Sequence, residues 1–218
     1  DYQAAFEGFK AGSYTFRNEA SSLAWATGYD FPALKKGQVV KAELPNGNVA
    51  SGQAFAINLR RERFQDIRVR EALGLMFNFE WSNETLFYGL YARVNSIWEN
   101  SPLAATGTPT PEEAEILKPF AADLPAGVLT DPVAMAPVSG KRQLDRGNLR
   151  KAAALLDAAG WPVADDGMRR NAKGETLKVE ILNDDQSFDR VVNPYVENLR
   201  ALGVDAAMAR VDDAQYEN

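Results

Sequence analysis

The sequence predicts an α/β fold in which a mixed sheet is flanked by helices. Three observations point to this class. Four runs have the composition of strands, amphipathic helical runs accompany them, and late in the chain a strand, a helix and a second strand follow one another directly. A strand–helix–strand unit in one sheet is almost always a right-handed parallel crossover, so we expect the two late strands to pair in parallel.

The predicted strands cover residues 39–44, 53–59, 177–182 and 204–211. Their branched and aromatic residues favour an extended backbone. The run PNGN, at 45–48, has the chemistry of a turn and separates the first two strands.

Longer helices are predicted at residues 66–77, 148–159 and 187–202, with Asp66 and Asn148 as N-caps of the first two. Pro194 interrupts the third apolar stripe, and we expect a kink or a restart there. The predicted core residues on these helices are Leu73, Phe77, Leu156, Tyr195 and Leu199.

The helical pattern weakens between residues 101 and 140, a segment that holds seven of the eleven prolines. One short helix is predicted in it, over PEEAEILKPF. We interpret this segment as an irregular stretch on the surface of a single lobe formed by residues 1–218. Both chain ends carry patterns of regular structure, so we expect the chain to be a piece of a longer protein.

Composition narrows the classes of function. The 218 residues include no histidine and no cysteine, which removes the commonest general base, the commonest metal ligand and disulfides. No cofactor or metal is predicted. The net charge of −6 argues against nucleic acid or an anionic membrane as the main partner. No apolar run approaches the roughly 18 residues typical of a membrane span.

Two short segments contain candidate binding residues. Trp25 and Tyr29 lie on a run rich in small residues, where aromatic rings can form a ligand platform or ordinary core. Arg93 and Asn95 lie in a short polar run after a helix, which either lines a cleft or ties a loop to the body. The acidic pair Asp184 and Asp185 precedes a predicted helix. A favourable interaction with the dipole of that helix explains the pair more simply than catalysis does.

Several motifs in order resemble family 5 of the extracellular solute-binding proteins, which are the dipeptide and oligopeptide receptors of ABC importers. They are FAINLRRERFQDIRVREALGLMFNFEWSNETLFYGLY, ALLDAAGW, NAKGETL, KVEIL and NLRALGVDAAMARVDDAQY. SLAWATGYDFPAL and RVNSIWENSPLAATG resemble more closely the branch that serves microcin C-type importers. The resemblance covers essentially the whole chain.

The resemblance implies a fragment from the C-terminal lobe of a two-lobed receptor that closes over a peptide. It also implies a periplasmic protein with a signal peptide upstream, a peptide or peptide-conjugate ligand, ABC permease subunits as partners, and no enzymatic activity. It brings Gln53 and Phe55 toward the cleft, near Trp25 and Tyr29, with Arg93 and Asn95 at the rim.

Two other classes of protein remain as alternatives. One is a self-contained α/β hydrolytic enzyme that uses carboxylates, against which stands the lack of a legible nucleophile–base pair. The other is a scaffold or interaction domain, against which stands the ordered series of receptor motifs.

Overall fold

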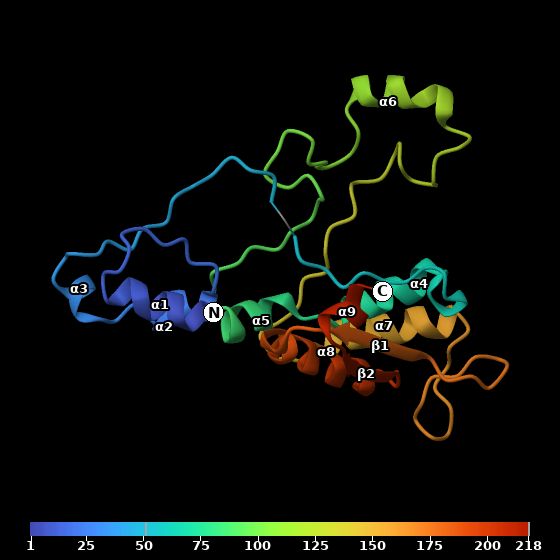
Figure 1. The fold of residues 1–218 in the computed structure, drawn as a ribbon. Helices are drawn as coiled ribbons and strands as arrows, with labels where there is room; N and C mark the ends of the chain where they lie inside the picture. Colours follow the sequence, from blue (N-terminus) through green and yellow to red (C-terminus); the bar gives the residue numbers. More distant parts are fainter. Residues whose placement is uncertain (51, 218) are drawn as a thin grey trace.

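The computed structural model describes residues 1–50 and 52–217 (Figure 1). The N-terminal helices lie at one end of the molecule, and a body of helices and two strands lies at the other. In chain order the elements are α1 (Tyr2–Lys10), α2 (Ser22–Thr27), α3 (Pro32–Lys35), η1 (Glu62–Phe64), α4 (Ile67–Leu75), α5 (Phe79–Leu86), α6 (Pro111–Leu117), η2 (Lys118–Phe120), α7 (Arg146–Ala158), β1 (Lys178–Asn183), η3 (Gln186–Phe188), α8 (Asp189–Ala201), β2 (Asp205–Arg210) and α9 (Asp213–Glu217).

The parallel pairing predicted for the two late strands is confirmed. β1 and β2 pair in parallel, from Lys178 opposite Asp205 to Asn183 opposite Arg210. The crossover between them is α8, which packs against β2. Side chains along β1 alternate between exposed and buried, because successive residues of a strand point to opposite faces. The β1–α8–β2 unit is therefore the part of the structure that gives it its α/β class.

The two earlier strand predictions are wrong within the described residues. Segments 39–44 and 53–59 form no strand there, and the sheet is two-stranded and parallel rather than mixed. The physical reason is that a strand needs a neighbouring backbone for its N–H and C=O groups, and composition cannot supply one. Val40 and Leu44 accordingly remain 82% and 74% exposed.

The helices follow the predicted pattern with small shifts. Asp66 caps α4 as expected, its side chain accepting a hydrogen bond from the Arg68 N–H. The cap of α7 is Asp145 rather than the predicted Asn148. Asp145 accepts from the Asn148 N–H at 2.8 Å, so the helix begins one turn earlier. Pro194 lies inside α8, which continues through it to Ala201 instead of restarting.

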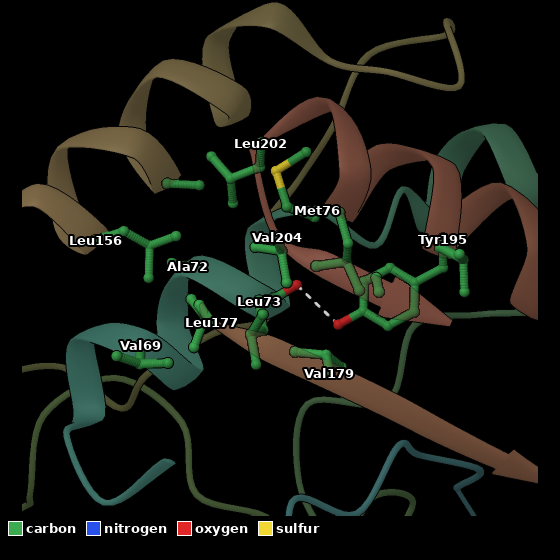
Figure 2. Close-up of a cluster of buried hydrophobic side chains, with 14 of the residues drawn as sticks. Val69, Ala72, Leu73, Met76, Leu156, Leu177, Val179, Tyr195, Leu202 and Val204 are labelled. Carbon is green, nitrogen blue, oxygen red and sulfur yellow. Dashed lines mark hydrogen bonds between the residues drawn. The ribbon is translucent and has the colours of Figure 1, made fainter. Parts of the chain in front are cut away.

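The core is built where α4, α7 and α8 pack around the two strands (Figure 2). Of the five predicted core residues, Leu73, Leu156, Tyr195 and Leu199 are buried. Phe77 is only half-buried, because it follows the end of α4 and faces the edge of the body. The Tyr195 hydroxyl donates to the Leu73 carbonyl oxygen at 3.0 Å, which gives the one polar atom of this ring a partner inside the core.

A turn-rich hairpin at 161–177 is fixed to this core by the buried side chain of Arg169. Its Nε donates to the Leu202 carbonyl at 2.8 Å, and its Nη1 donates to Asp157 at 2.6 Å and to the Trp161 carbonyl at 2.7 Å. Burying a guanidinium is tolerated when its donors are satisfied in this way. Arg169 therefore ties α7, the hairpin and the end of α8 together.

The proline-rich segment at 101–140 contains α6 and η2 and is otherwise irregular. Thr110 begins α6 with a capping box, in which the Thr110 and Glu113 side chains each bond the other residue's N–H. The segment rises away from the body in Figure 1, and Ile116 and Phe120 on it are 70% and 58% exposed.

Replacing Leu156 tests the core. Its side chain is fully buried in the core that α7 shares with α4, so Leu156→Ala should lower the free energy of unfolding of the full-length protein by about 2–5 kcal/mol. Urea denaturation measures the difference, with the exposed Leu103→Ala as the matched control. A loss below about 0.5 kcal/mol, the usual range for surface positions, would contradict this account of the core.

Candidate ligand-binding surface

The predicted site residues fall into two groups that differ in their surroundings. Trp25 and Tyr29 belong to an N-terminal aromatic cluster on α1 and α2. Phe55 and Arg93 lie on the ring of Phe77, at the edge of the main body. Figure 1 places α1 and α2 at the opposite end of the molecule from α4 and α7.

The N-terminal cluster forms because α1 buries one face of phenylalanines. Phe6 and Phe9 are spaced so that both point to the same side of the helix. The Tyr29 ring lies between them and Trp25, with centroids 5.2 Å from Phe6, 6.5 Å from Phe9 and 5.7 Å from Trp25. Gly28 permits this approach, since a Cβ there would lie 2.8 Å from a Phe6 ring carbon.

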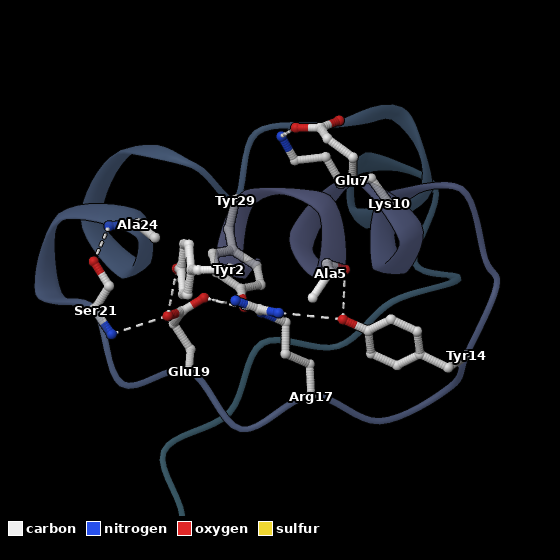
Figure 3. A network of polar contacts seen from close by, with 10 residues as sticks. All are labelled: Tyr2, Ala5, Glu7, Lys10, Tyr14, Arg17, Glu19, Ser21, Ala24 and Tyr29. Carbon is white, nitrogen blue, oxygen red and sulfur yellow. Dashed lines mark hydrogen bonds and ion pairs between the residues drawn. The ribbon is translucent and has the colours of Figure 1, made fainter.

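A buried ion pair completes the cluster (Figure 3). The Arg17 Nε lies 3.1 Å from the Glu19 carboxylate, and the two side chains are only 9% and 1% exposed. Glu19 also accepts from the Tyr2 hydroxyl at 2.6 Å and from the Tyr29 hydroxyl at 3.0 Å. The Ser21 N–H is a further donor, at 2.9 Å.

These contacts shift the titration of the groups involved. Burial by itself raises the pKa of Glu19, but the hydrogen bonds from Tyr2, Ser21, Arg17 and Tyr29 outweigh it and lower the pKa. Burial, with the neighbouring Glu19 charge, raises the pKa of Tyr29 to about 12. Glu19 is therefore a structural anion at neutral pH.

Trp25 is half-buried, and a lysine partly covers it. The Lys41 Nζ lies 4.2 Å from the centroid of the indole and donates to the Trp25 carbonyl at 2.5 Å. A cation over an indole face is favourable, so Lys41 competes with any ligand for this face. This contact could not be predicted from the sequence, because Lys41 lies sixteen residues away from Trp25.

Phe55 has one side on the core and another in solvent. Its ring centroid lies 5.6 Å from Phe77 and 4.9 Å from Tyr195, and the residue is 38% exposed. Gln53, two residues earlier, is exposed. Phe55 is thus the point at which the aromatic core reaches the surface. The expectation that Gln53 and Phe55 share one face assumed a strand at 53–59, and the described residues form no strand there.

Arg93 and Asn95 lie just after α5 and are half-buried. The Arg93 Cζ lies 5.5 Å from the Phe77 centroid and 5.4 Å from that of Phe79. Burial lowers the pKa of Arg93, and the Glu80 charge offsets part of this effect. The Asn95 Oδ1 accepts from the Ala136 N–H at 3.0 Å, so Asn95 ties the proline-rich segment to the body.

A shallow hollow of about 430 Å³ lies beside the Phe79 ring. Its lining residues are Phe79, Glu80, Asn83, Glu84, Tyr88 and Gly89. Among residues 1–50 and 52–217, no three or more acidic side chains are grouped so that they could hold a metal ion. Aromatic rings, one guanidinium and amides can bind a ligand by apolar contact and hydrogen bonds.

Solved structures of solute-binding proteins share this fold. The chain aligns with NikA from Brucella suis, solved in complex with Fe(III)-EDTA, at 19% identity and a TM-score of 0.61, covering 99% of this chain and 36% of that one. It also aligns with the oligopeptide-binding protein AppA from Bacillus subtilis, solved in complex with a nonapeptide, at 17% identity and a TM-score of 0.57. This second alignment covers 100% of this chain and 36% of AppA. These two likenesses concern the fold alone, and this chain corresponds to 36% of each of those proteins.

The sequence comparison identifies the family. The model of the bacterial extracellular solute-binding proteins, family 5 Middle, matches residues 1–218. The chain is 43% identical over 220 residues to the probable peptide-binding protein YejA of Agrobacterium fabrum, and 33% identical over 224 residues to the peptidoglycan-binding protein YepA of the same organism. It covers 36% and 35% of these relatives, about a third of their length. The chain belongs to the family 5 extracellular solute-binding proteins and forms part of one lobe of that two-lobed fold.

Removing the Tyr29 hydroxyl tests the buried carboxylate. Glu19 has a lowered pKa, so its stabilising effect is present above the ordinary glutamate pKa and is lost as pH falls through the lowered value. Tyr29→Phe should therefore cost about 1–2 kcal/mol of unfolding free energy at pH 7 and progressively less below about pH 4. Urea denaturation of the full-length protein at a series of pH values measures both quantities.

Tyr91→Phe is the control for this variant, because the Tyr91 ring is 44% exposed and stacks on Phe87. It should change stability by less than about 0.5 kcal/mol at every pH. A Tyr29→Phe effect that stays constant down to pH 3 would show that the hydroxyl does not act through the Glu19 charge.

Proposed function

We propose that the whole protein is the substrate-binding component of an ABC importer, which captures oligopeptides or peptide conjugates in the periplasm and delivers them to membrane permease subunits. The observation that carries this proposal is the match of the family 5 model over every residue of the chain. The relatives named as peptide-binding and peptidoglycan-binding support a ligand that contains amino acids linked by peptide bonds.

Within that function, we propose that this chain supplies one wall of the ligand cleft. The residues proposed for it are Trp25, Tyr29, Gln53, Phe55, Arg93 and Asn95. Phe55 offers an exposed aromatic surface held in place by two core rings, which is the arrangement expected of an apolar contact in a binding site. Trp25 offers a second one, with Lys41 as the group that a ligand would displace.

The ligand class is proposed more narrowly from the sequence motifs. SLAWATGYDFPAL and RVNSIWENSPLAATG favour the branch of receptors that serves microcin C-type importers. A receptor of this kind would accept a peptide joined to another group, and the exposed aromatic surfaces suit such a mixed ligand.

Binding without chemistry is the activity we propose. Its support is that the relatives are solute-binding proteins and that the sequence offers no histidine or cysteine as base or nucleophile. None of the helices in residues 1–50 and 52–217 combines the length and the apolar character of a membrane span. A carboxylate-dependent hydrolase is the less favoured alternative.

Two substitutions test the proposed wall in the full-length protein. Trp25→Ala and Gln53→Ala should each weaken the binding of a peptide ligand by roughly 3–30-fold, because each removes one of several contacts and none dominates. Isothermal titration calorimetry gives the dissociation constants, and melting curves verify the fold. Ile116→Ala, on exposed α6, is the matched control and should leave affinity unchanged.

If Trp25→Ala and Gln53→Ala both fold and both bind the peptide with unchanged affinity, the assignment of these residues to the wall of the cleft is wrong. The proposal that the protein binds peptides would survive that result, since wild-type binding is measured in the same experiment.

The absence of turnover is a separate expectation. The full-length protein, incubated with peptides and with chromogenic esters, should release no product above the buffer rate, as followed by mass spectrometry and absorbance. Hydrolysis that co-purifies with the protein and disappears when a single carboxylate in this chain is replaced would establish the enzyme alternative.

A further inference from the structure

Arg93 is a half-buried cation that has no ion-pair partner among the described residues. Among residues 1–50 and 52–217, the salt bridges do not include it, and no hydrogen bond of its guanidinium is found. A guanidinium withdrawn from water without a carboxylate is unfavourable, and burial accordingly lowers its pKa. By contrast, the buried arginine Arg169 donates from Nε and Nη1 to three acceptors.

The acid whose charge acts on Arg93 is Glu80, and it is held in another interaction. Glu80 is close enough to influence the Arg93 charge, but its Oε2 accepts from the Ser139 N–H at 2.9 Å. This bond directs the carboxylate to the proline-rich segment. Arg93 therefore keeps its forked N–H donors available while Glu80 serves as a structural acceptor.

The guanidinium is also presented in a fixed place and remains accessible. Phe77 and Phe79 lie within 5.5 Å of its Cζ, and cation–π contacts of this kind hold an arginine in position without using its N–H donors. In the described residues, the fully buried side-chain polar atoms without a partner are Ser22 Oγ and Arg63 Nε. The Arg93 nitrogens, which also lack partners, therefore retain contact with solvent.

We propose that Arg93 binds a carboxylate of the peptide ligand. The inference rests on the proposed peptide-receptor function and adds a specificity-determining contact to it. A planar guanidinium matches a carboxylate with two parallel N–H···O bonds, which makes it selective for that group. Phe55 shares the Phe77 ring with Arg93, so an apolar contact for the ligand lies beside the charged one.

The carboxylate can come from the C-terminus of a peptide or from an acidic side chain. Three probes separate these sources: penta-alanine with a free C-terminus, penta-alanine amide, and an amidated pentapeptide of alanines with glutamate in the middle. Calorimetry with the full-length receptor measures the affinity for each probe, for wild type and for three variants. The variants are Arg93→Gln, which removes the charge, Arg93→Lys, which keeps it without the fork, and Arg150→Gln.

Arg150→Gln is the matched control, since Arg150 is exposed on α7 and its loss changes the net charge equally. We expect wild type to bind one or both carboxylate-bearing probes roughly 10–100-fold more tightly than penta-alanine amide. Arg93→Gln should abolish that preference and leave the affinity for the amide within about two-fold. Arg93→Lys should retain part of the preference for the carboxylate-bearing probes, and Arg150→Gln should retain all of that preference.

Three results would overturn the inference alone. The first is a wild-type receptor that binds all three probes equally, and the second is an Arg93→Gln variant that keeps the wild-type preference for the carboxylate probes. The third is an Arg93→Gln variant, folded by its melting curve, that loses affinity equally for the amide and the carboxylate probes, which would make Arg93 a wall residue without charge recognition. Failure of wild type to bind any of the probes would instead count against the proposed function, and the inference would fall with it.

Discussion

The structure depends on Tyr195, the residue at which the core and the candidate surface meet. Its hydroxyl is bonded to the Leu73 carbonyl, and its ring is packed beneath Phe55 and beside Phe77. Burial raises the pKa of this phenol, so the hydroxyl remains a hydrogen-bond donor. Because α8 carries Tyr195 and also links the two parallel strands, the placement of the aromatic surface follows from the crossover that defines the fold.

Charge is distributed in the molecule according to two different requirements. In the N-terminal cluster, Arg17 and Glu19 are buried together, and tyrosine hydroxyls satisfy the remaining acceptor capacity. At the edge of the main body, Arg93 is partly desolvated, and its N–H groups donate no hydrogen bond to the other described residues. A closed network of the first kind stabilises structure, whereas an open donor set of the second kind suits the recognition of an anion.

The absence of histidine and cysteine acquires meaning together with the family assignment. Receptors that bind and release need shape, aromatic contact and hydrogen bonds, and the residues proposed to supply them in this chain include Phe55, Trp25 and Arg93. A neighbouring group limits one of them, because Lys41 lies over Trp25. A ligand at Trp25 would therefore exchange an existing contact for a new one, which would keep the affinity moderate and allow release.

Residue periodicity and chain order were enough to predict the elements that are stabilised locally or by segments adjacent along the chain. Helix α4 with its Asp66 cap, the apolar stripe of α8 and the parallel unit β1–α8–β2 follow from periodicity and from the right-handed crossover. Residues 39–44 and 53–59 could not be decided in this way, because a strand exists only when another backbone lies beside it. The same is true of the candidate site. Trp25 and Arg93 could be chosen as candidates from the sequence. The tertiary structure was needed to show that Lys41 lies over Trp25 and that Arg93 lies on Phe77 without a carboxylate partner among the described residues, because these contacts join side chains from distant positions in the chain.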